Sequence, residues 1–249
     1  MSRLVLFYVS LYDVIFYFMK NIVVLTGAGM SVESGFSTFR GADGLWNNYK
    51  VEDVASHSGW TRNPELVNEF YNQMRKQLLS AHPNKGHFLL AELENKHSIS
   101  IITQNVDNLH ERAGSSKVLH LHGELMKVTS SKDVDNPNCI KKLNAENYEV
   151  KPGDLAADGS LLRPYIVFFQ EPVPNIERAI GITQQADIFV IIGTSLNVYP
   201  AASLIQFVKK DVPIYLIDPN PVPVSEYRNI VYIQKTASAG IQLLMDKYL

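Results

Sequence analysis

A glycine-bearing turn directly after a short apolar run is the first feature of this chain whose residue types indicate chemistry. Residues 21–26 read Asn-Ile-Val-Val-Leu-Thr, which is typical of an inner strand of a parallel sheet. Gly27 and Gly29 follow, and glycines at this point let the backbone turn sharply and approach a phosphate. From Ser31 we expect a helix whose free N–H groups face that anion. Val32 replaces the third glycine of the simple dinucleotide fingerprint, so an ordinary strand–helix turn explains the two glycines about as well.

Polar side chains follow the other apolar runs at the points where those runs end. An imidazole at such a point titrates near neutrality and can act as a base. In an open parallel sheet, ligands bind beyond the carboxyl ends of the strands. The clustering therefore favours one functional cleft over unrelated polar loops. The residues are Gln104, Asn105, Asp107, His122, Thr194 and Ser195.

A second histidine, His120, lies two residues before His122, so both would point to the same side of a strand. For His120 we favour a structural, hydrogen-bonded role. No third ligand with matching spacing is evident, and we therefore expect no metal at this pair. Asn108 and His110 are also expected to have structural roles, in a loop that caps a short helix.

The apolar runs alternate with segments typical of helices. This alternation predicts an α/β fold, a Rossmann-type parallel sheet with helices on both faces. Residues 127–162 break the alternation and are expected to form a small subdomain, while residues 36–59 are expected to cover a ligand. Strands are expected at residues 22–25, 98–103, 118–121, 165–169, 188–192 and 214–217, and helices at residues 64–79, 84–95, 176–185, 201–209 and 239–249.

The composition excludes several classes of protein. A chain of 249 residues can bury a full α/β core. Its 23 Lys and Arg nearly balance 25 Asp and Glu without a long basic run, so we expect no nucleic-acid partner. Cys139 is the only cysteine, which excludes an internal disulfide and favours a cytoplasmic location. Residues 1–18 are apolar but marginal in length for a membrane span, so we expect an upstream extension and no membrane partner.

Four stretches of sequence carry a family resemblance, and they occur in the family's order. They are residues 27–41 (GAGMSVESGFSTFRG), 103–110 (TQNVDNLH), 121–125 (LHGEL) and 192–196 (IGTSL). Together they resemble the sirtuins, which are NAD-dependent protein-lysine deacylases, and the likeness runs from about residue 21 to the C-terminus. The branch that it resembles most is the bacterial and mitochondrial desuccinylase-like one.

The resemblance implies a sirtuin catalytic domain over residues 19–249. Its large Rossmann domain would comprise about residues 19–35, 76–125 and 163–249, and the small subdomain with the cofactor loop would comprise about residues 36–75 and 126–162.

The resemblance also implies the reaction. The acyl oxygen of a modified lysine attacks the ribose carbon that bears nicotinamide, and a base then helps a ribose hydroxyl to attack the acyl group. Free lysine and O-acyl-ADP-ribose result. His122 matches the family's base. Asn105 and Asp107 match residues that line the nicotinamide pocket, where an amide and a carboxylate can bind a carboxamide and stabilise positive charge on the ribose.

NAD is the cofactor that the resemblance implies. Arg40 would meet phosphate, and Phe39 would shield the reactive ribose from water. Asp218 stands where many members have Asn near the adenosine ribose, and a carboxylate there favours NAD over NADP. The expected cofactor-binding residues are Gly27, Ala28, Gly29, Ser31, Thr38, Phe39, Arg40, Trp46, Gln104, Asn105, Val106, Asp107, Gly193, Thr194, Ser195, Asp218, Asn220 and Ala237.

The small subdomain departs from the family in its cysteines. Most sirtuins hold a structural zinc there with two Cys-x-x-Cys pairs. Residues 126–162 contain Cys139 alone and no histidine, so we expect no zinc and no other metal. Some other packing must hold this subdomain together, and the candidates are Ile140, Leu143, Tyr148, Val150 and Leu155.

The expected acyl pocket is mixed. Ala55 and Tyr71 match a branch that removes succinyl and malonyl groups, in which alanine widens the pocket and tyrosine helps to grip the carboxylate. Met74 occupies the place of that branch's arginine, and Arg75 lies one residue further, about 100° around a helix. We therefore expect a roomy pocket with weak selectivity for acidic acyl groups. The segment that pairs with the substrate peptide is expected to contribute Val167, Phe169, Gln170 and Glu171, with Gln170 where the family usually has glycine.

The residues alone are compatible with two other functions. A protein mono-ADP-ribosyltransferase or NAD glycohydrolase would use the same nicotinamide chemistry with another acceptor. A non-catalytic NAD-sensing module would need neither His122 nor the Asn105–Asp107 pair. We expect acyl-lysine proteins or peptides to be the substrates, because residues 167–171 match a peptide-pairing strand.

Overall fold

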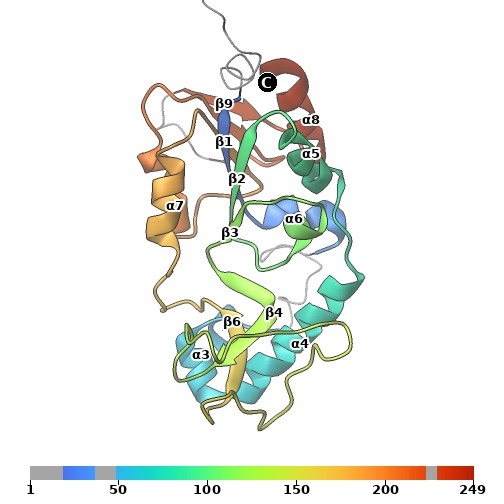
Figure 1. The fold of residues 1–249 in the computed structure, drawn as a ribbon, viewed down its shortest axis with the longest axis vertical. Helices are drawn as coiled ribbons and strands as arrows, with labels where there is room; N and C mark the ends of the chain where they lie inside the picture. Colours follow the sequence, from blue (N-terminus) through green and yellow to red (C-terminus); the bar gives the residue numbers. More distant parts are fainter. Residues whose placement is uncertain (1–18, 37–48, 223–228) are drawn as a thin grey trace, which may run out of the picture.

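A six-stranded parallel sheet forms the larger of two lobes, which lie one above the other in Figure 1. The structure is a computed structural model that describes residues 19–36, 49–222 and 229–249. The strand order is β3-β2-β1-β7-β8-β9, and it reverses between β1 and β7, which creates a switch point at their carboxyl ends. The strands are β1 (Asn21–Thr26), β2 (Ser98–Thr103), β3 (Val118–His120), β7 (Ile188–Ile192), β8 (Ile214–Ile217) and β9 (Ile230–Ile233).

Helices cover both faces of this sheet, because its inner strands are apolar on both sides. Val24 of β1 packs in one core with Leu90, whereas its neighbour Val23 packs in a second core with Leu204. The first core lies under α5 (Lys85–Leu93) and α8 (Ala237–Tyr248), and the second lies under α7 (Ile176–Thr183) and the 3-10 helix η4 (Ala201–Phe207). This confirms the predicted Rossmann-type α/β class.

The small lobe combines a three-stranded antiparallel sheet, of order β5-β4-β6, with helices that the structure describes within residues 51–80. Its core joins side chains of α4 and β4, among them Phe70 and Leu125, with Phe168 from the chain after β6. The elements are α2 (Val51–Val54), α3 (His57–Arg62), α4 (Pro64–Ser80), β4 (Gly123–Ser130), β5 (Lys141–Lys142) and β6 (Leu162–Ile166). The short helix α6 (Leu109–Arg112) lies between the lobes in Figure 1.

Two fully buried arginines link the elements of the small lobe. Arg163 donates hydrogen bonds to both carboxylate oxygens of Glu171, at 2.7 and 2.9 Å, and its guanidinium lies 4.0 Å from the centre of the Phe168 ring. Arg75 of α4 donates from Nε to the Leu125 carbonyl at 2.9 Å. Burial lowers the pKa of Arg75 to about 10. Polar contacts of this kind and an apolar core thus hold the lobe together.

The packing residues expected in the small lobe divide into two groups. Leu143 and Val150 are buried in its core, and Tyr148 packs against that core. Leu155 is 58% exposed, so the expectation that it helps to pack the lobe is wrong. Cys139 is buried and is the only cysteine of the chain. The small lobe therefore cannot form a zinc site with four thiolates. Within residues 19–36, 49–222 and 229–249, no group of three or more His, Cys, Asp and Glu could hold a metal.

Several predicted elements differ from the structure. The strand expected at residues 165–169 is β6, which lies at 162–166 and belongs to the antiparallel sheet. Strands β4 and β9 were not expected. The helix expected at residues 201–209 is the 3-10 helix η4. The helix expected from Ser31 is a single 3-10 turn, η2 (Val32–Ser34), and another such turn, η1 (Ala28–Met30), precedes it. Residues 1–18, expected as an upstream extension, lie outside the described residues.

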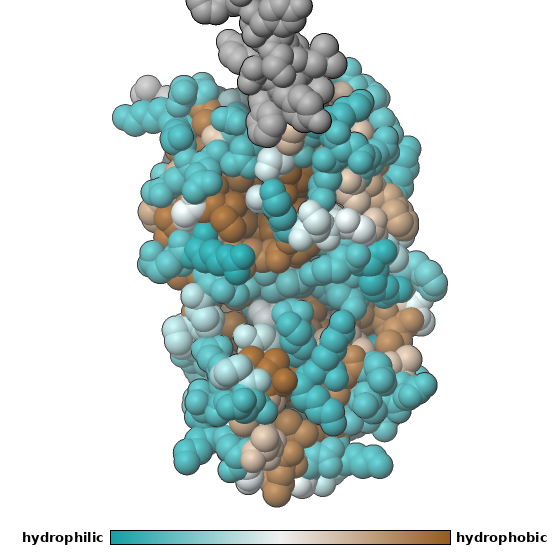
Figure 2. All heavy atoms as spheres, in the orientation of Figure 1, coloured by the Kyte–Doolittle hydropathy of each residue, from teal (hydrophilic) through white to brown (hydrophobic). Residues whose placement is uncertain are grey.

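The molecular surface in Figure 2 is mostly hydrophilic on the face shown, with apolar patches over the sheet of the large lobe and at the tip of the small one. In the part of the chain that the structure describes, no helix is long and apolar enough to cross a membrane.

Candidate active site

Three glycines bring the loops after β1 and β7 into direct contact at the switch point. The Gly29 N–H donates to the Gly193 carbonyl at 2.9 Å, and the Gly27 N–H donates to the Ile192 carbonyl at 3.0 Å. A Cβ atom on Gly29 would lie 2.5 Å from the Gly193 Cα, so no side chain fits there. Gly193 itself has φ +63°, a conformation that favours glycine. The glycines therefore serve close packing of the two loops as well as the sharp turn.

The loop after β2 joins this turn through a buried polar cluster. The Asn105 Nδ2 donates to the Ser31 Oγ at 3.2 Å, and that hydroxyl donates to the Asp107 Oδ2 at 2.8 Å. Asp107 also accepts the Leu109 N–H at 3.0 Å. Burial raises the pKa of Asp107, and these two hydrogen bonds oppose the shift. The structure therefore brings together three expected residues from chain segments more than 70 residues apart.

A second contact spans the carboxyl ends of β2 and β7. The Gln104 Nε2 donates to the Thr194 Oγ1 at 3.1 Å. Val106 lies on the other side of the same loop, where its carbonyl accepts the Leu125 N–H of β4 at 2.8 Å. The loop therefore connects the large lobe with the small one.

His122 follows β3 and lies at the same edge of the sheet. Its Nδ1 lies 3.0 Å from the Gln104 carbonyl oxygen, so Nδ1 carries the proton and Nε2 is the free base nitrogen of the neutral ring. Nε2 has no hydrogen-bond partner among the described residues. Burial lowers the pKa of His122, and the bond to Gln104 only partly offsets this. The imidazole is therefore neutral near pH 7, with a basic nitrogen available.

His120 makes different contacts from the same strand. Its Nδ1 lies 3.0 Å from the Asn105 carbonyl oxygen, and its Nε2 lies 2.8 Å from the Glu111 Oε1. The Asn175 Nδ2 donates to the His120 carbonyl at 2.9 Å. The Glu111 contact could not be predicted from local patterns, because only the fold brings α6 next to the end of β3.

The residues expected near the adenosine lie further along the same sheet edge. Asp218 follows β8 and is buried, and its Oδ1 accepts the Asn220 N–H at 2.8 Å. Asp218 Oδ2 has no partner among the described residues. Asn220 and Ser195 are exposed, and Ala237 is the first residue of α8 and is buried. Thr38, Phe39, Arg40 and Trp46, also expected to bind the cofactor, lie outside the described residues.

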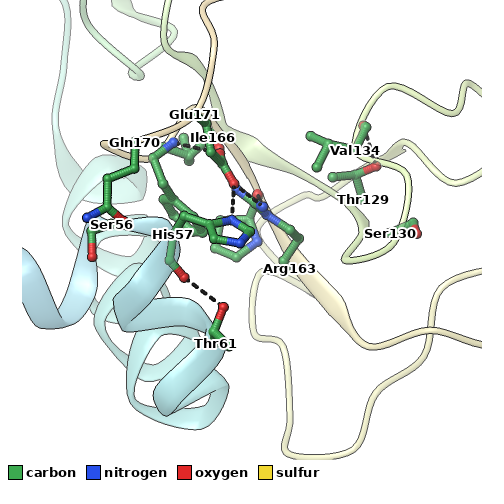
Figure 3. Close-up of polar contacts among 12 residues, drawn as sticks. Ser56, His57, Thr61, Thr129, Ser130, Val134, Arg163, Ile166, Gln170 and Glu171 are labelled. Atoms are coloured by element: carbon green, nitrogen blue, oxygen red, sulfur yellow. Dashed lines mark hydrogen bonds and ion pairs between the residues drawn. The ribbon is translucent and has the colours of Figure 1, made fainter.

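The segment expected to pair with a peptide is attached to both the base and the small lobe. The Val167 N–H donates to the His122 carbonyl at 3.0 Å, and the Phe169 N–H donates to the Ala55 carbonyl at 2.8 Å. Phe169 is 47% exposed. The Glu171 carboxylate, in contrast, points inward between Arg163 and His57, as Figure 3 shows. Its side chain is thus engaged in the lobe's own packing.

Gln170 adopts an unusual backbone conformation in this segment. Its φ is +76°, in the left-handed region that side chains other than glycine seldom occupy. Its Oε1 accepts the Ser58 N–H of α3 at 3.1 Å, which ties the exposed side chain to a helix of the small lobe.

The expected acyl-pocket residues lie together in the core of the small lobe. Tyr71 and Met74 are buried on α4, and Ala55 is buried just after α2. The Tyr71 ring lies 5.9 Å from the Phe168 ring. Burial raises the pKa of Tyr71, so its phenol is neutral. Arg75 points toward β4, where it bonds the Leu125 carbonyl, and its guanidinium is thereby engaged in the lobe's own packing.

A cavity of about 240 Å³ lies between the lobes, beside residues 106–108 of the loop after β2. Asp107 and Glu111 line it together with Lys127 and Lys142 from the antiparallel sheet. His122 and the glycine turn are not among the residues that line it.

The donor set of the sheet edge fits a dinucleotide. The glycines let the turn after β1 pack directly against Gly193 and Thr194, which brings the backbones of both loops together at the switch point, where a diphosphate would bind. Asp218 keeps one oxygen free for a ribose hydroxyl, and His122 keeps Nε2 free for a second one. These groups occupy successive strand ends on both sides of the switch point, where doubly wound folds bind dinucleotides.

The sequence also matches known proteins. A sequence model of the Sir2 family matches residues 27–200. The NAD-dependent protein deacylase of Bacteroides thetaiotaomicron is 61% identical over 226 residues, which cover 91% of this chain and 97% of that protein. The NAD-dependent protein deacylase of Helicobacter pylori (strain 26695) is 52% identical over 229 residues, covering 92% and 97% respectively.

Solved structures agree with these matches. A Sir2 homologue in complex with NAD has a TM-score of 0.79 at 39% identity, covering 91% of this chain and 88% of that one. A Sir2 structure with a p53 peptide and NAD+ has a TM-score of 0.77 at 31% identity, covering 95% and 96%. The resemblance to the sirtuins is thus confirmed, and the chain belongs to the Sir2 family.

Proposed function

We propose that this chain is an NAD-dependent protein-lysine deacylase, which transfers the acyl group from lysine to ADP-ribose with release of nicotinamide. One observation carries the proposal: His122 presents a free base nitrogen at the switch point of the sheet, beside the Asn105–Ser31–Asp107 cluster. The deacylase relatives, 61% and 52% identical over almost their whole length, support the same reaction.

NAD supplies an electrophilic ribose carbon and a leaving nicotinamide when it is bound. The glycine turn after β1, Thr194 and Ser195 hold the diphosphate, and Asp218 accepts a hydroxyl of the adenosine ribose. Asn105 binds the nicotinamide carboxamide through its own amide. The Asp107 carboxylate stabilises the positive charge that develops on the ribose as nicotinamide leaves.

His122 is the general base of the second step. The Gln104 carbonyl holds the Nδ1 proton and so fixes the ring with Nε2 as acceptor. Because burial keeps the ring neutral near pH 7, Nε2 takes the proton of a ribose hydroxyl as that hydroxyl attacks the acyl group. His122 also accepts the Val167 N–H through its carbonyl, which places the base next to the segment proposed to pair with the substrate peptide.

Acyl-lysine side chains of proteins or peptides are the proposed substrates, and the pocket is proposed to favour neutral over acidic acyl groups. Tyr71 is buried and neutral, Met74 has no charge, and Arg75 is committed to the Leu125 carbonyl. Arg75 uses Nε for the Leu125 carbonyl and Nη1 for the Asn72 Oδ1, so only Nη2 lacks a partner among the described residues. A single nitrogen cannot make the bidentate contact that favours a succinyl carboxylate.

Mass spectrometry of the products tests the function directly. The purified chain is incubated with NAD and with acetyl-, succinyl- or longer fatty-acyl-lysine versions of one peptide. Free lysine peptide and O-acyl-ADP-ribose in equal amounts are the expected products. An ADP-ribosylated protein would instead indicate a transferase, and free ADP-ribose without deacylated peptide would indicate a glycohydrolase. A strong preference for succinyl-lysine would overturn the pocket assignment alone.

The cytoplasm is the proposed location of the protein, because a single buried cysteine suits a reducing compartment. Fractionation of cells with an antibody against the native chain tests this, and recovery with the membrane or secreted fraction would contradict it.

A further inference from the structure

The two ring nitrogens of His120 both face groups that accept hydrogen bonds. One is the Asn105 carbonyl oxygen at 3.0 Å, and the other is the Glu111 carboxyl at 2.8 Å. A neutral imidazole has only one N–H. It could therefore donate to one of these two oxygens only, and the lone pair of its other nitrogen would face, and be repelled by, the lone pairs of the other oxygen. An imidazolium has an N–H at each nitrogen and satisfies both contacts. The geometry therefore favours a cationic ring at this position.

The charged groups that face His120 from the surrounding elements also favour a cationic ring. Burial lowers its pKa, but Glu111 on α6, the Asn105 carbonyl and Glu124 on β4 together raise it above its ordinary value. Burial also raises the pKa of Glu111, yet its hydrogen bond with His120 outweighs this, so the carboxyl is ionised. His110 on α6 is buried, and burial lowers its pKa far enough to keep it neutral.

His122 differs from His120 although it lies only two residues away. Among residues 19–36, 49–222 and 229–249, its ring contacts the Gln104 carbonyl and no acidic side chain, and burial lowers its pKa. One strand end thus carries a cation and a neutral base. The two rings hold the carbonyls of two consecutive residues, Gln104 and Asn105.

Contacts lead from His120 to the proposed nicotinamide pocket. His120 fixes the backbone of Asn105, whose side chain donates to Ser31, which in turn donates to Asp107. The positive charge of His120 also opposes the effect of burial on Asp107, which otherwise favours the protonated acid. Removing that charge would therefore weaken both the orientation of Asn105 and the ionisation of Asp107.

We propose that His120, held as a cation by Glu111, is a positioning residue for the departure of nicotinamide: it orients Asn105 and keeps Asp107 ionised. This inference rests on the proposed function and assigns a role within the same site. His120 touches no substrate in this role, because both of its nitrogens are occupied by protein groups. The Glu111 side chain is 41% exposed on the wall of the inter-lobe cavity, so the pair equilibrates with bulk pH.

The first experiment measures exchange of labelled nicotinamide into NAD against pH, in the full chain with an acyl-lysine peptide. Wild-type exchange should fall at high pH, as His120 loses its proton. Glu111→Gln should move this fall to lower pH by about one unit, because it removes the nearest anion. Glu124→Gln is the matched control, since that carboxylate pairs with Lys127 and does not touch His120, and it should move the fall by less than a third as much. Equal profiles for wild type and Glu111→Gln would overturn the proposal.

Two substitutions of His120 separate orientation from charge. The Nδ2 of His120→Asn takes the place of Nδ1 and can still donate to the Asn105 carbonyl. The Nε2 of His120→Gln reaches only toward Glu111. We expect exchange to fall roughly tenfold in His120→Asn and roughly a hundredfold in His120→Gln, as one or both effects are lost. Equal losses in the two variants, with melting temperatures lowered in parallel, would indicate a merely structural role.

A readout without turnover keeps the proposal separate from the proposed function. Two-bond ¹H–¹⁵N spectra of the folded chain distinguish an imidazolium from each neutral tautomer. At pH 7, His120 should be an imidazolium and His122 a neutral ring protonated at Nδ1. A neutral His120 would overturn the inference whatever the turnover. A cationic His120 in a chain that leaves NAD and acyl-lysine untouched would overturn the proposed function, and with it the positioning role.

Discussion

The carboxyl edge of the large sheet and the interior of the small lobe both contain buried polar networks, but they differ in what they leave unpaired. At the edge, His122 Nε2 and Asp218 Oδ2 lack a hydrogen-bond partner among the described residues. In the small lobe, Arg163 donates to Glu171 and to the Ile166 carbonyl, and the Glu171 carboxylate also accepts the Phe168 N–H. The first network presents free groups to a ligand, whereas the Arg163–Glu171 network of the small lobe is paired within the protein. Arg75 Nη2 and Asn68 Oδ1 are also buried in this lobe, without a hydrogen-bond partner among the described residues.

Because of this difference, we expect substitutions in the two regions to change different properties, turnover at the sheet edge and folding stability in the small lobe. Removing a group from the sheet edge should slow turnover and change unfolding only slightly, since the atom that faces the ligand is unpaired. For His122 the protein loses only the Nδ1 bond to the Gln104 carbonyl. Removing a group from the small-lobe network should lower the free energy of unfolding, because it leaves a buried partner unsatisfied. The substitutions below test how sharply the two regions divide in this way.

The largest effect is expected for His122→Ala at the edge. Loss of a general base costs about 100- to 10,000-fold in rate, so deacylation should fall by that factor. Nicotinamide exchange should persist, because the base acts after nicotinamide has left. The melting temperature should fall by only about 2–4 °C, the cost of losing one hydrogen bond, from Nδ1 to the Gln104 carbonyl. Steady-state kinetics and calorimetry on one preparation measure the deacylation rate and the melting temperature. A large loss of stability would contradict the hypothesis that groups at the sheet edge serve turnover rather than stability.

In the small lobe, Arg163→Met should mainly destabilise the fold. Breaking a buried ion pair by removing one partner costs up to about 3–5 kcal/mol, and Glu171 would keep only the His57 ring and the Phe168 N–H as partners. Burial tends to raise the pKa of Glu171, but the Arg163 hydrogen bonds prevail and lower it, which shows how much this carboxylate depends on its partner. Urea unfolding gives the loss, and NAD affinity measured by calorimetry should stay within about twofold.

The double variant Arg163→Met, Glu171→Gln controls this experiment. It removes the stranded charge as well, so it should recover part of the lost stability. A double variant as unstable as the single one would mean that packing against Phe168, rather than the charge, accounts for the effect.

A third network lies inside the large lobe and tests the comparison through pH. His87 of α5 is fully buried 4.8 Å from the His110 ring, and burial lowers its pKa to about 4. Since the unfolded chain binds the proton more tightly, the folded state is fully stabilised above about pH 6.5 and loses stability as pH falls toward 4. His87 alone should cost about 3 kcal/mol over this window.

His87→Gln is the matched variant for this measurement. The His87 Nδ1 accepts the Asn84 N–H in a capping box, and Gln at the same position can accept it too. Unfolding in urea at pH 7 and pH 4.5 should show a smaller drop for this variant than for the wild type. An equal drop in both proteins would place the acid sensitivity elsewhere.

Much of the large lobe could be predicted from local patterns. The runs at 22–25 and 188–192 are buried on both faces, so composition alone marks them as inner parallel strands. Strand β9 was missed because its residues are only partly buried at the sheet edge. The antiparallel pairing of β4 with β6 joins segments more than 30 residues apart, and no local period encodes such a pairing. η4 has an amphipathic sequence, and its 3-10 form depends on tertiary packing.

The site residues were predictable as types but not as contacts. The order of the strand-end motifs indicated which residues gather at the edge, and the structure brings Gln104 to Thr194 and Ser31 to Asp107. The ionised state of His120 was not predictable, because it depends on Glu111, which approaches only through the fold. The conformation of Gln170 was likewise hidden, since a single residue type says nothing about its own φ angle.

The smallest effect is expected at Gln170, where the two regions meet. A side chain in the left-handed region costs on the order of 1 kcal/mol, and Gly removes that cost while losing the hydrogen bond to Ser58 and gaining entropy in the unfolded chain. Gln170→Gly should therefore raise the free energy of unfolding by less than about 1 kcal/mol, whereas Gln170→Ala keeps the strain, loses the bond and should lower it. Because the segment is proposed to pair with the peptide, Gln170→Gly should also change the KM for an acyl-lysine peptide more than the KM for NAD. Equal changes in both constants would mean that Gln170 acts on the lobe as a whole and not on the peptide groove.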